Sequence, residues 1–490
     1  MRVLWRIGLT LLVATFLYGC AVGAQFDVSF SADAYGGEFS GKCVVYLSQG
    51  RGEPRFGPNW FNPQPMYSKD FEKVQPGQAM VIDNSAVGYP ASLDKLAHGT
   101  YTVQAVVDLN LGDREIGRSP GNLFSKPQQV TIGPETGKIR IVCDQVQPDE
   151  LFKDTDAIKA ARLRSNLLSK FYERPTIMRA AVVLPESWTP TGSRIYPVIY
   201  EISGFGGSFL DYSGRTQRRG TVRDGEEFIL VHLDPTVPTG HCAFADSANN
   251  GPWGKALIEE FIPYIETTFR GLGKPEGRFV TGHSSGGWSS LWLQVTYPEF
   301  FGGTWSTSPD PVDFRDFQQI DLYRQGVNMF KDAAGKDRPI ARQGDTPIIF
   351  YKQFSDMERP IRGEQLGSFE AVFSPKGKDG KPLQLWNRVN GAVDNDVALA
   401  WRKYDIGHIL RSDWKKLGPT LAGKLHVYMG TQDTFYLEGA TELLQKDLKA
   451  LGSDAIVELL PGDHGSVLTA ALRARIDKQM ADAWRAKRPR

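Results

Sequence analysis

Phe279-Val280-Thr281-Gly282-His283-Ser284-Ser285-Gly286-Gly287 joins a short apolar run to a segment with helical periodicity that continues to residue 297. A nucleophilic serine has to project from a tight turn between a strand and a helix, and glycines on both sides allow the backbone to approach closely. The N-terminus of the following helix also favours negative charge that develops during a reaction. Gly-x-Ser-x-Gly is common by itself, but its position between strand and helix predicts that Ser284 is a nucleophile.

A serine nucleophile requires a histidine base, and three histidines follow Ser284 in the chain. His464 comes directly after the last expected strand and opens the last expected helix, which is where the base of an α/β-hydrolase belongs. His426 lies in the middle of an expected strand, and His408 lies in a segment that interrupts the strand–helix rhythm. We therefore predict that His464 is the base.

The carboxylate that orients the base should follow the preceding strand, because the order along the chain is serine, acid, histidine. Gly430-Thr431-Gln432-Asp433-Thr434 places Asp433 at this position. Asp463 is the alternative acid, although adjacent side chains on one turn rarely face each other. Asp433 is the predicted acid.

Two backbone N–H groups are expected to stabilise the oxyanion. One belongs to Ser285, directly after the nucleophile. The other is expected in the glycine-rich loop Ser203-Gly204-Phe205-Gly206-Gly207-Ser208, which follows an apolar strand-like run. Phe205 and Gly206 are equally good candidates there.

Short apolar runs and helical periods alternate through residues 148–490, which predicts an α/β sheet with crossover helices. The expected strands are 195–200, 228–233, 279–281, 424–429 and 455–460, and the expected helices are 157–171, 256–269, 286–297, 437–451 and 466–484. The first of these helices is expected to connect two domains. Residues from about 310 to 420 break the rhythm with aromatic and Pro/Gly-rich sequence, and we expect this insertion to form a lid over the site.

Residues 25–147 show short alternating runs separated by turn residues, which predicts an all-β sandwich domain. Trp60, Phe61 and Tyr67 are interpreted either as a sugar-binding platform or as packing residues. Cys43 and Cys143 lie near the two ends of this segment, and a disulfide between them and two separate buried thiols are both open interpretations.

Residues 1–24 resemble an export signal, with Arg2 and Arg6 before a short apolar run and small residues at a cleavage site before Gln25. The alternative is a lipoprotein signal that ends before Cys20, whose lipid would attach the chain to a membrane. The chain is accordingly expected outside the cytoplasm, in the periplasm, the medium or at the cell envelope.

Composition narrows the function further. Among 490 residues, 57 are Lys or Arg and 56 are Asp or Glu, so a net charge of +1 gives no general attraction to nucleic acid. The four cysteines lack C-x-x-C spacing, and no cluster typical of zinc is apparent. The sequence predicts neither a metal nor another cofactor, and it leaves the oligomeric state open.

Several stretches resemble the esterase D-like putative esterase family of α/β-hydrolases, at about residues 179–308 and 424–467. These are 196–202 with its glycine loop, Asn250-Gly251-Pro252-Trp253-Gly254 leading to 261–266, and 279–287 followed by Tyr297-Pro298-Glu299-Phe300-Phe301. The family includes feruloyl esterases, S-formylglutathione hydrolases, siderophore esterases and mycolyltransferases. The resemblance implies the same triad of Ser284, Asp433 and His464.

The expected function is a secreted serine esterase that hydrolyses a small-molecule or polymer-linked ester through an acyl-enzyme. An acyltransferase or a serine peptidase of the same fold is an enzymatic alternative. A surface-binding lipoprotein on an inactive hydrolase scaffold is the alternative from another class, because a fold does not guarantee its chemistry.

Overall fold

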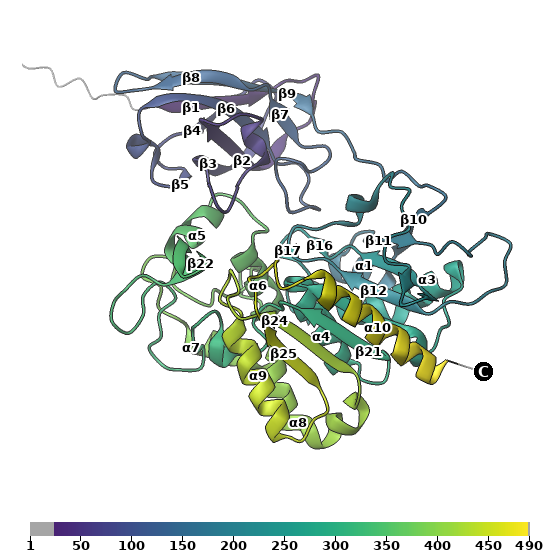
Figure 1. Cartoon of the computed structure of the whole chain (residues 1–490). Coiled ribbons are helices and arrows are strands. Elements are labelled where there is room, and N and C mark those ends of the chain that lie inside the picture. The colour runs from purple at the N-terminus through teal and green to yellow at the C-terminus, as the bar shows by residue number, and fades with distance from the viewer. Residues whose placement is uncertain (1–23, 489–490) are drawn as a thin grey trace, which may run out of the picture.

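Two large sheets organise the chain in the computed structural model, which describes residues 24–488 (Figure 1). The second sheet contains eight strands in the order β10-β11-β15-β12-β20-β21-β24-β25. Their bounds are Ile158–Arg164 (β10), Ile177–Val183 (β11), Ile229–Leu233 (β15), Val198–Ile202 (β12), Arg278–His283 (β20), Gly303–Thr307 (β21), Leu425–Gly430 (β24) and Ile456–Leu460 (β25). All neighbours from β15 to β25 are parallel, whereas β10 and β11 form an antiparallel edge. The predicted alternation of strands and helices is therefore present.

Helices cover both faces of this sheet, which is why its strands read as continuous apolar runs. Helices α3 (Ile262–Phe269), α4 (Ser285–Thr296), α8 (Ile406–Leu421) and α9 (Glu438–Ala450) share one apolar cluster with Val280 and Val427. Helix α10 (Ala470–Lys487) packs on the opposite face with Phe279 and Tyr428. Adjacent residues of one strand thus supply the two cores.

The direction in which the sheet grows reverses at β12, because β15 lies on one side of it and β20 on the other. Ligands of open α/β sheets bind at the carboxyl ends of the strands beside such a reversal. Gly204 lies in the loop after β12, and Ser284 directly follows β20. The topology therefore brings the predicted oxyanion loop next to the predicted nucleophile.

The first sheet contains nine strands and lies above the second in Figure 1. They are β1 (Gln25–Phe30), β2 (Phe39–Ser48), β3 (Met66–Val74), β4 (Met80–Ile82), β5 (Val87–Tyr89), β6 (Gly99–Val107), β7 (Leu123–Ser125), β8 (Gln128–Ile132) and β9 (Lys138–Val146). In β1, Phe26, Val28 and Phe30 alternate into one buried cluster that also takes side chains from β2, β3, β6 and β9. The predicted all-β segment is present. Its strands are hydrogen-bonded into one nine-stranded sheet around this core, whereas a sandwich was expected to contain two separate sheets.

Two sequence expectations are wrong in part. Residues 158–164 were expected in a helix, but they form the edge strand β10, and only α1 (Asn166–Tyr172) is helical. The C-terminal boundary of the expected insertion, at about residue 420, is also wrong. Residues 406–421 form α8, a crossover helix that contacts α4 and α9. The elements between β21 and α8 are the strands β22 (Pro339–Gln343) and β23 (Thr346–Phe350) and the helices α5 (Tyr351–Glu358), α6 (Gln365–Phe373) and α7 (Asn395–Trp401).

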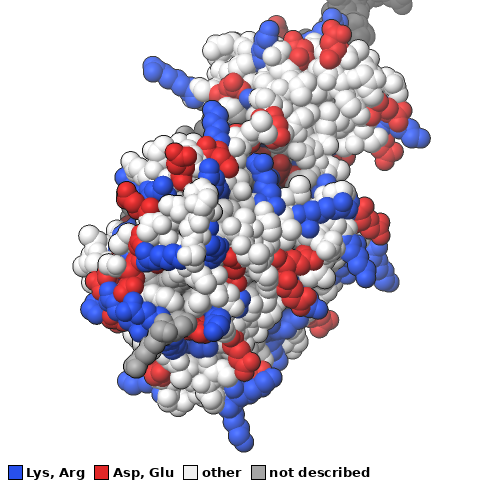
Figure 2. Space-filling model, turned by 90° about the vertical axis from the view of Figure 1, so that its right-hand side faces the viewer, with Lys and Arg blue, Asp and Glu red and all other residues white. Residues whose placement is uncertain are grey.

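Cys43 and Cys143 are both buried in the N-terminal core as free thiols, so the structure favours the interpretation without a disulfide. Residues 1–23 of the expected signal segment, which include Cys20, lie outside the described residues. Within residues 24–488, no helix is long and apolar enough to cross a membrane. Figure 2 shows basic and acidic side chains interspersed over the visible face of the molecule.

Candidate active site

Ser284 occupies a strained turn between β20 and α4, with φ +60° and ψ −125°. Such a conformation is costly for a residue with a side chain, and it marks the elbow that exposes a nucleophile. The two flanking glycines are required because no side chain would fit at their positions. A Cβ on Gly282 would lie 2.1 Å from the carbonyl oxygen of Gly286, and a Cβ on Gly286 would lie 2.0 Å from that of Ile202. The sequence pattern therefore reflects close backbone packing behind the serine.

Asp433 and His464 form a hydrogen-bonded pair, with 2.7 Å between Asp433 Oδ2 and His464 Nδ1. The carboxylate is buried, and the amide of Phe435 donates a 2.8 Å hydrogen bond to its Oδ1. Burial lowers the pKa of His464, but the hydrogen bond and charge of Asp433 outweigh burial and raise the pKa above its ordinary value. The pair has the arrangement of a base and its orienting acid.

Ser284 and His464 line one cavity, although no hydrogen bond joins them among the described residues. Distances between nucleophile and base are often long before a substrate binds. The ring of His464 is held in place by Phe435, in an edge-to-face contact with 5.0 Å between ring centroids. The structure thus brings the three predicted triad residues to one place.

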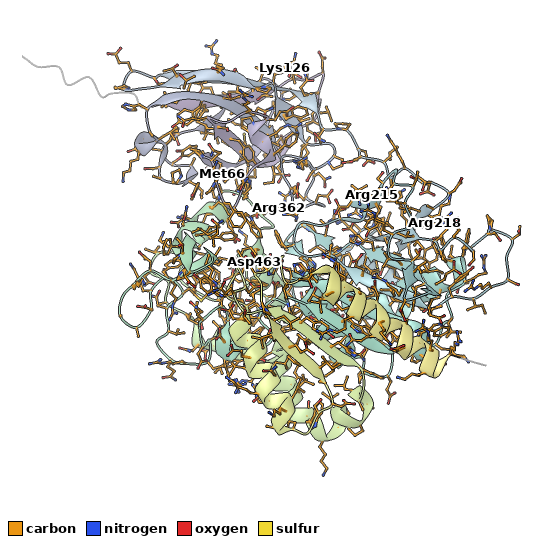
Figure 3. All side chains as sticks on the ribbon, in the orientation of Figure 1. Met66, Lys126, Arg215, Arg218, Arg362 and Asp463 are labelled. Atoms are coloured by element: carbon orange, nitrogen blue, oxygen red, sulfur yellow. The ribbon has the colours of Figure 1, made fainter. Side chains whose placement is uncertain are left out.

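The alternative acid and the alternative bases considered from the sequence do not join the triad. Asp463, labelled in Figure 3, accepts hydrogen bonds from the amides of Gly465 and Ser466 and has none to His464. His426 is stacked on Trp305, with 4.6 Å between ring centroids, on the sheet. His408 lies in the first turn of α8 and is not part of the cavity.

The glycine loop after β12 makes a tight turn beside Ser284. The amide of Gly207 donates a 3.1 Å hydrogen bond to the carbonyl of Gly204, and Gly206 has φ +88° at the third position of the turn. A Cβ on Gly204 would lie 3.2 Å from Ser284 Cβ, so the loop and the nucleophile are in close contact. Of the two candidate donors, Phe205 lines both the cavity that holds Ser284 and a neighbouring one, whereas Gly206 lines the neighbouring one and not the cavity of Ser284.

A buried histidine that the sequence did not single out supports this loop. The amide of Ala243 donates a 2.9 Å hydrogen bond to His241 Nδ1, which leaves Nε2–H to donate to the carbonyl of Ser203 at 3.0 Å. Burial lowers the pKa of His241 to about 4, so its ring is neutral and keeps this tautomer at neutral pH. His241 therefore fixes the start of the candidate oxyanion loop.

Asp310 is a second carboxyl group at the site, and the sequence analysis missed it. It lines the same cavity as Ser284, accepts a 2.5 Å hydrogen bond from Ser285 Oγ, and lies 3.3 Å from Gln365 Nε2. Burial raises its pKa to about 6. The only available signal was its position three residues after β21, at the carboxyl edge of the sheet.

The cavity beside Ser284 has a volume of about 280 Å³, and most of its remaining lining is apolar. Side chains from three parts of the chain contribute: Trp60 from a loop of the N-terminal domain, Ile340, Ile349, Phe354 and Phe369 from the segment between β21 and α8, and Phe435 and Leu437 after β24. Within residues 24–488, no group of three or more His, Cys, Asp or Glu side chains is arranged to hold a metal ion. The site combines a half-buried serine, a base and an apolar cavity.

The family described as "Putative esterase" matches residues 174–438, more than half of the chain. Esterase Rv1288 of Mycobacterium tuberculosis H37Rv is 33% identical over 144 residues, a match that covers 28% of this chain and 30% of that protein. Thus the match spans less than a third of the curated relative.

Solved structures of two named enzymes are also similar. A ferulic acid esterase has a TM-score of 0.38 at 14% identity, with 68% of this chain and 99% of that chain covered. An S-formylglutathione hydrolase from Agrobacterium tumefaciens has a TM-score of 0.41 at 15% identity, with 68% and 98% covered. The resemblance noted in the sequence is confirmed by the match to the family, together with the predicted hydrolase fold class: this chain belongs to the putative esterase family of α/β-hydrolases.

Proposed function

We propose that this protein is a serine esterase that cleaves carboxylic esters through an acyl-enzyme. The observation that carries the proposal is the convergence of a strained Ser284 and the hydrogen-bonded Asp433–His464 pair on one cavity. Membership of the putative esterase family supports it.

In the first half of the reaction, Ser284 Oγ attacks the ester carbonyl while His464 Nε2 takes the hydroxyl proton. Asp433 accepts from Nδ1–H and stabilises the imidazolium ion that forms. The C–O bond to the alcohol then breaks, and His464 returns its proton to the departing alkoxide. In the second half, His464 removes a proton from the water molecule that attacks the acyl-enzyme. It then gives this proton to Ser284 Oγ as the acyl C–O bond breaks and the acid leaves.

The oxyanion formed in each half needs two N–H donors at one point. The amide of Ser285 is available because it begins α4 and no described backbone carbonyl accepts from it. The second donor is the amide of Phe205, since this residue lines the same cavity as Ser284. Gly206, the other candidate, faces the neighbouring cavity.

The segment between β21 and α8 is proposed to act as the lid of the site. It contributes Ile340, Ile349, Phe354 and Phe369 to the cavity wall, and its helix α6 supplies Gln365 beside Asp310. Apolar lid side chains would exclude water from the acyl group and shape the choice of substrate.

The experiment that tests the function is active-site labelling. The purified protein is treated with a fluorophosphonate and the modified peptide is identified by mass spectrometry. Labelling at Ser284, lost in Ser284→Ala and accompanied by hydrolysis of p-nitrophenyl acetate in the unsubstituted protein, supports an esterase. Failure of Ser284 to react in the folded protein contradicts it and favours the binding-protein alternative. Acyl transfer is distinguished by adding an acceptor alcohol and measuring whether an ester forms faster than the acid.

Export is a further part of the proposal, and it rests on the sequence of residues 1–24. Intact-mass measurement of the protein from its native host distinguishes the two signals. A mature chain that begins at Gln25 supports cleavage, and a lipid-modified chain that begins at Cys20 supports membrane attachment. Retention of Met1 contradicts both.

A further inference from the structure

An aromatic residue of the N-terminal sheet domain reaches into the cavity beside Ser284. Trp60 lies in the loop between η1 (Pro54–Phe56) and β3, and it lines that cavity together with Ser284 and His464. Its ring centroid lies 5.1 Å from that of Phe354 and 5.3 Å from that of Phe205. The N-terminal domain therefore supplies part of the wall of the active site.

Trp60 is held in this position by polar contacts between the two halves of the molecule. Its Nε1–H donates a 2.8 Å hydrogen bond to Glu364 Oε2 in the segment between β21 and α8. Arg114 of the N-terminal domain lies 3.7 Å from the other oxygen of the same carboxyl group. Two residues earlier, Arg362 forms a bidentate ion pair with Asp108, and Figure 3 shows Arg362 between the two halves. The loop is thus fixed against the catalytic domain.

The aromatic platform considered for Trp60, Phe61 and Tyr67 cannot include Tyr67, whereas Trp60 and Phe61 line one cavity together. Tyr67 is fully buried in the N-terminal core, and Phe61 is 56% exposed. Trp60 and Phe205 instead separate two cavities. The apolar one contains Ser284, and a second one of about 380 Å³ lies between the domains. Arg114 and Arg118 line the second cavity, so it differs strongly in polarity from the first.

We propose that Trp60 forms the wall between the acyl pocket and the neighbouring cavity, so that the N-terminal domain determines which acyl groups the enzyme accepts. This inference rests on the proposed esterase function. A cavity of about 150 Å³ lined by apolar side chains holds one benzene molecule. The pocket of about 280 Å³ therefore suits an apolar acyl group that consists of one aromatic ring and a short linker, and Trp60 stops longer chains.

The test compares three p-nitrophenyl esters, which share one leaving group and differ in the acyl group: acetate, 3-phenylpropanoate and dodecanoate. In Trp60→Ala, we expect kcat/KM for 3-phenylpropanoate to fall about tenfold, because the pocket loses an apolar wall. The acetate value should change by less than about threefold, since so small an acyl group fills little of the cavity and gains little from its walls. The ratio of dodecanoate to 3-phenylpropanoate should rise by at least about tenfold as the two cavities merge.

Two further variants keep the result interpretable. Trp60→Phe preserves the wall but loses the hydrogen bond to Glu364, and it should retain the preference for 3-phenylpropanoate. Phe71→Ala is the matched control, because Phe71 is a half-buried aromatic residue of β3 that lines neither cavity. It should change all three esters by the same factor. If Trp60→Ala does not fold, Trp60→Leu replaces it in the same comparison.

The outcomes separate this inference from the proposed function. If Ser284 is labelled by a fluorophosphonate but the folded Trp60 variants keep the wild-type order of esters, Trp60 does not determine specificity and the inference is wrong. If Ser284 is not labelled and no ester is cleaved, the proposed function fails and the inference fails with it. A parallel drop for all three esters in Trp60→Ala would reduce Trp60 to a packing residue, which also overturns the inference.

Discussion

Ser285 Oγ donates a 2.5 Å hydrogen bond to Asp310 Oδ2, and the amide of Asp310 donates a 3.2 Å hydrogen bond to the carbonyl of Ser284. One aspartate thus holds both the proposed nucleophile and the residue whose N–H is proposed to stabilise the oxyanion. Burial raises the pKa of Asp310 to about 6, and above this pH its negative charge also acts on His464, whose pKa it helps to raise. Asp310 is therefore a positioning residue that also affects the protonation of the base.

Asp310→Asn should shift the acidic limb of the kcat/KM–pH profile to lower pH. The base has to be neutral to accept a proton, so activity is lost as the pH falls through the pKa of His464. Removing a nearby carboxylate destabilises the imidazolium ion and lowers that pKa. The profile is measured between pH 5 and 9 with p-nitrophenyl acetate. Asp463→Asn is the control, because its exposed carboxylate is screened by water and should shift the limb less. An unshifted limb in Asp310→Asn would mean that its charge does not reach the base.

Asp433→Asn should reduce kcat by about 10⁴-fold, as loss of the orienting carboxylate leaves His464 in the wrong tautomer. Asp463→Asn should retain activity within about threefold, because Asp463 only caps the turn before α10. Steady-state kinetics of both variants at pH 8 decide between the two acids. A larger loss in Asp463→Asn would show that the wrong carboxylate has been assigned.

Gly286→Ala should abolish activity and destabilise the protein, because a Cβ at this position would lie 2.0 Å from the carbonyl oxygen of Ile202. Gly465→Ala provides a matched glycine next to His464, and a Cβ there meets no atom within 4 Å. We expect its melting temperature and activity to stay near those of the unsubstituted protein. Thermal unfolding and ester hydrolysis are measured for both. Equal effects would argue against close packing at the elbow.

Phe354→Ala should change the preference among acyl groups, because it removes a wall of the cavity contributed by the segment between β21 and α8. Phe330→Ala removes a buried ring of the same segment that does not line the cavity. Each is expected to lower the free energy of unfolding by about 3–5 kcal/mol. Only Phe354→Ala should alter the relative kcat/KM of short and long acyl esters. If Phe330→Ala alters it equally, the effect comes from general loosening of the segment.

The catalytic half of the chain was largely predictable from its sequence, because its constraints are local. Gly282 and Gly286 mark the elbow since no side chain fits behind Ser284, and the chain order of an α/β sheet then points to Asp433 and His464. Those assignments stay predictions until activity is measured. The geometry agrees with them.

The edge strand β10 and two residues of the site leave no pattern in the local sequence from which they could be predicted. Residues 158–164 alternate Lys159, Arg162 and Arg164 with small or apolar residues, and this mixture resembles a solvated helix. The charges instead suit an edge strand, where they discourage pairing with another chain. Asp310 and Trp60 reach the site only through tertiary packing, so periodicity could not identify them.

The ion pair between Arg362 and Asp108 makes the evolution of the N-terminal domain depend on that of the catalytic domain. Asp108 is buried, and loss of either partner would leave the other charge uncompensated between the domains, which costs several kcal/mol. Neither residue can then be replaced alone without a loss of stability. Recombination that replaced one half of the chain with an unrelated domain would leave the charge on the other half without a partner. Among homologues that carry both segments, positions 108 and 362 should therefore covary, and the N-terminal sheet should have been inherited with the catalytic domain as one unit.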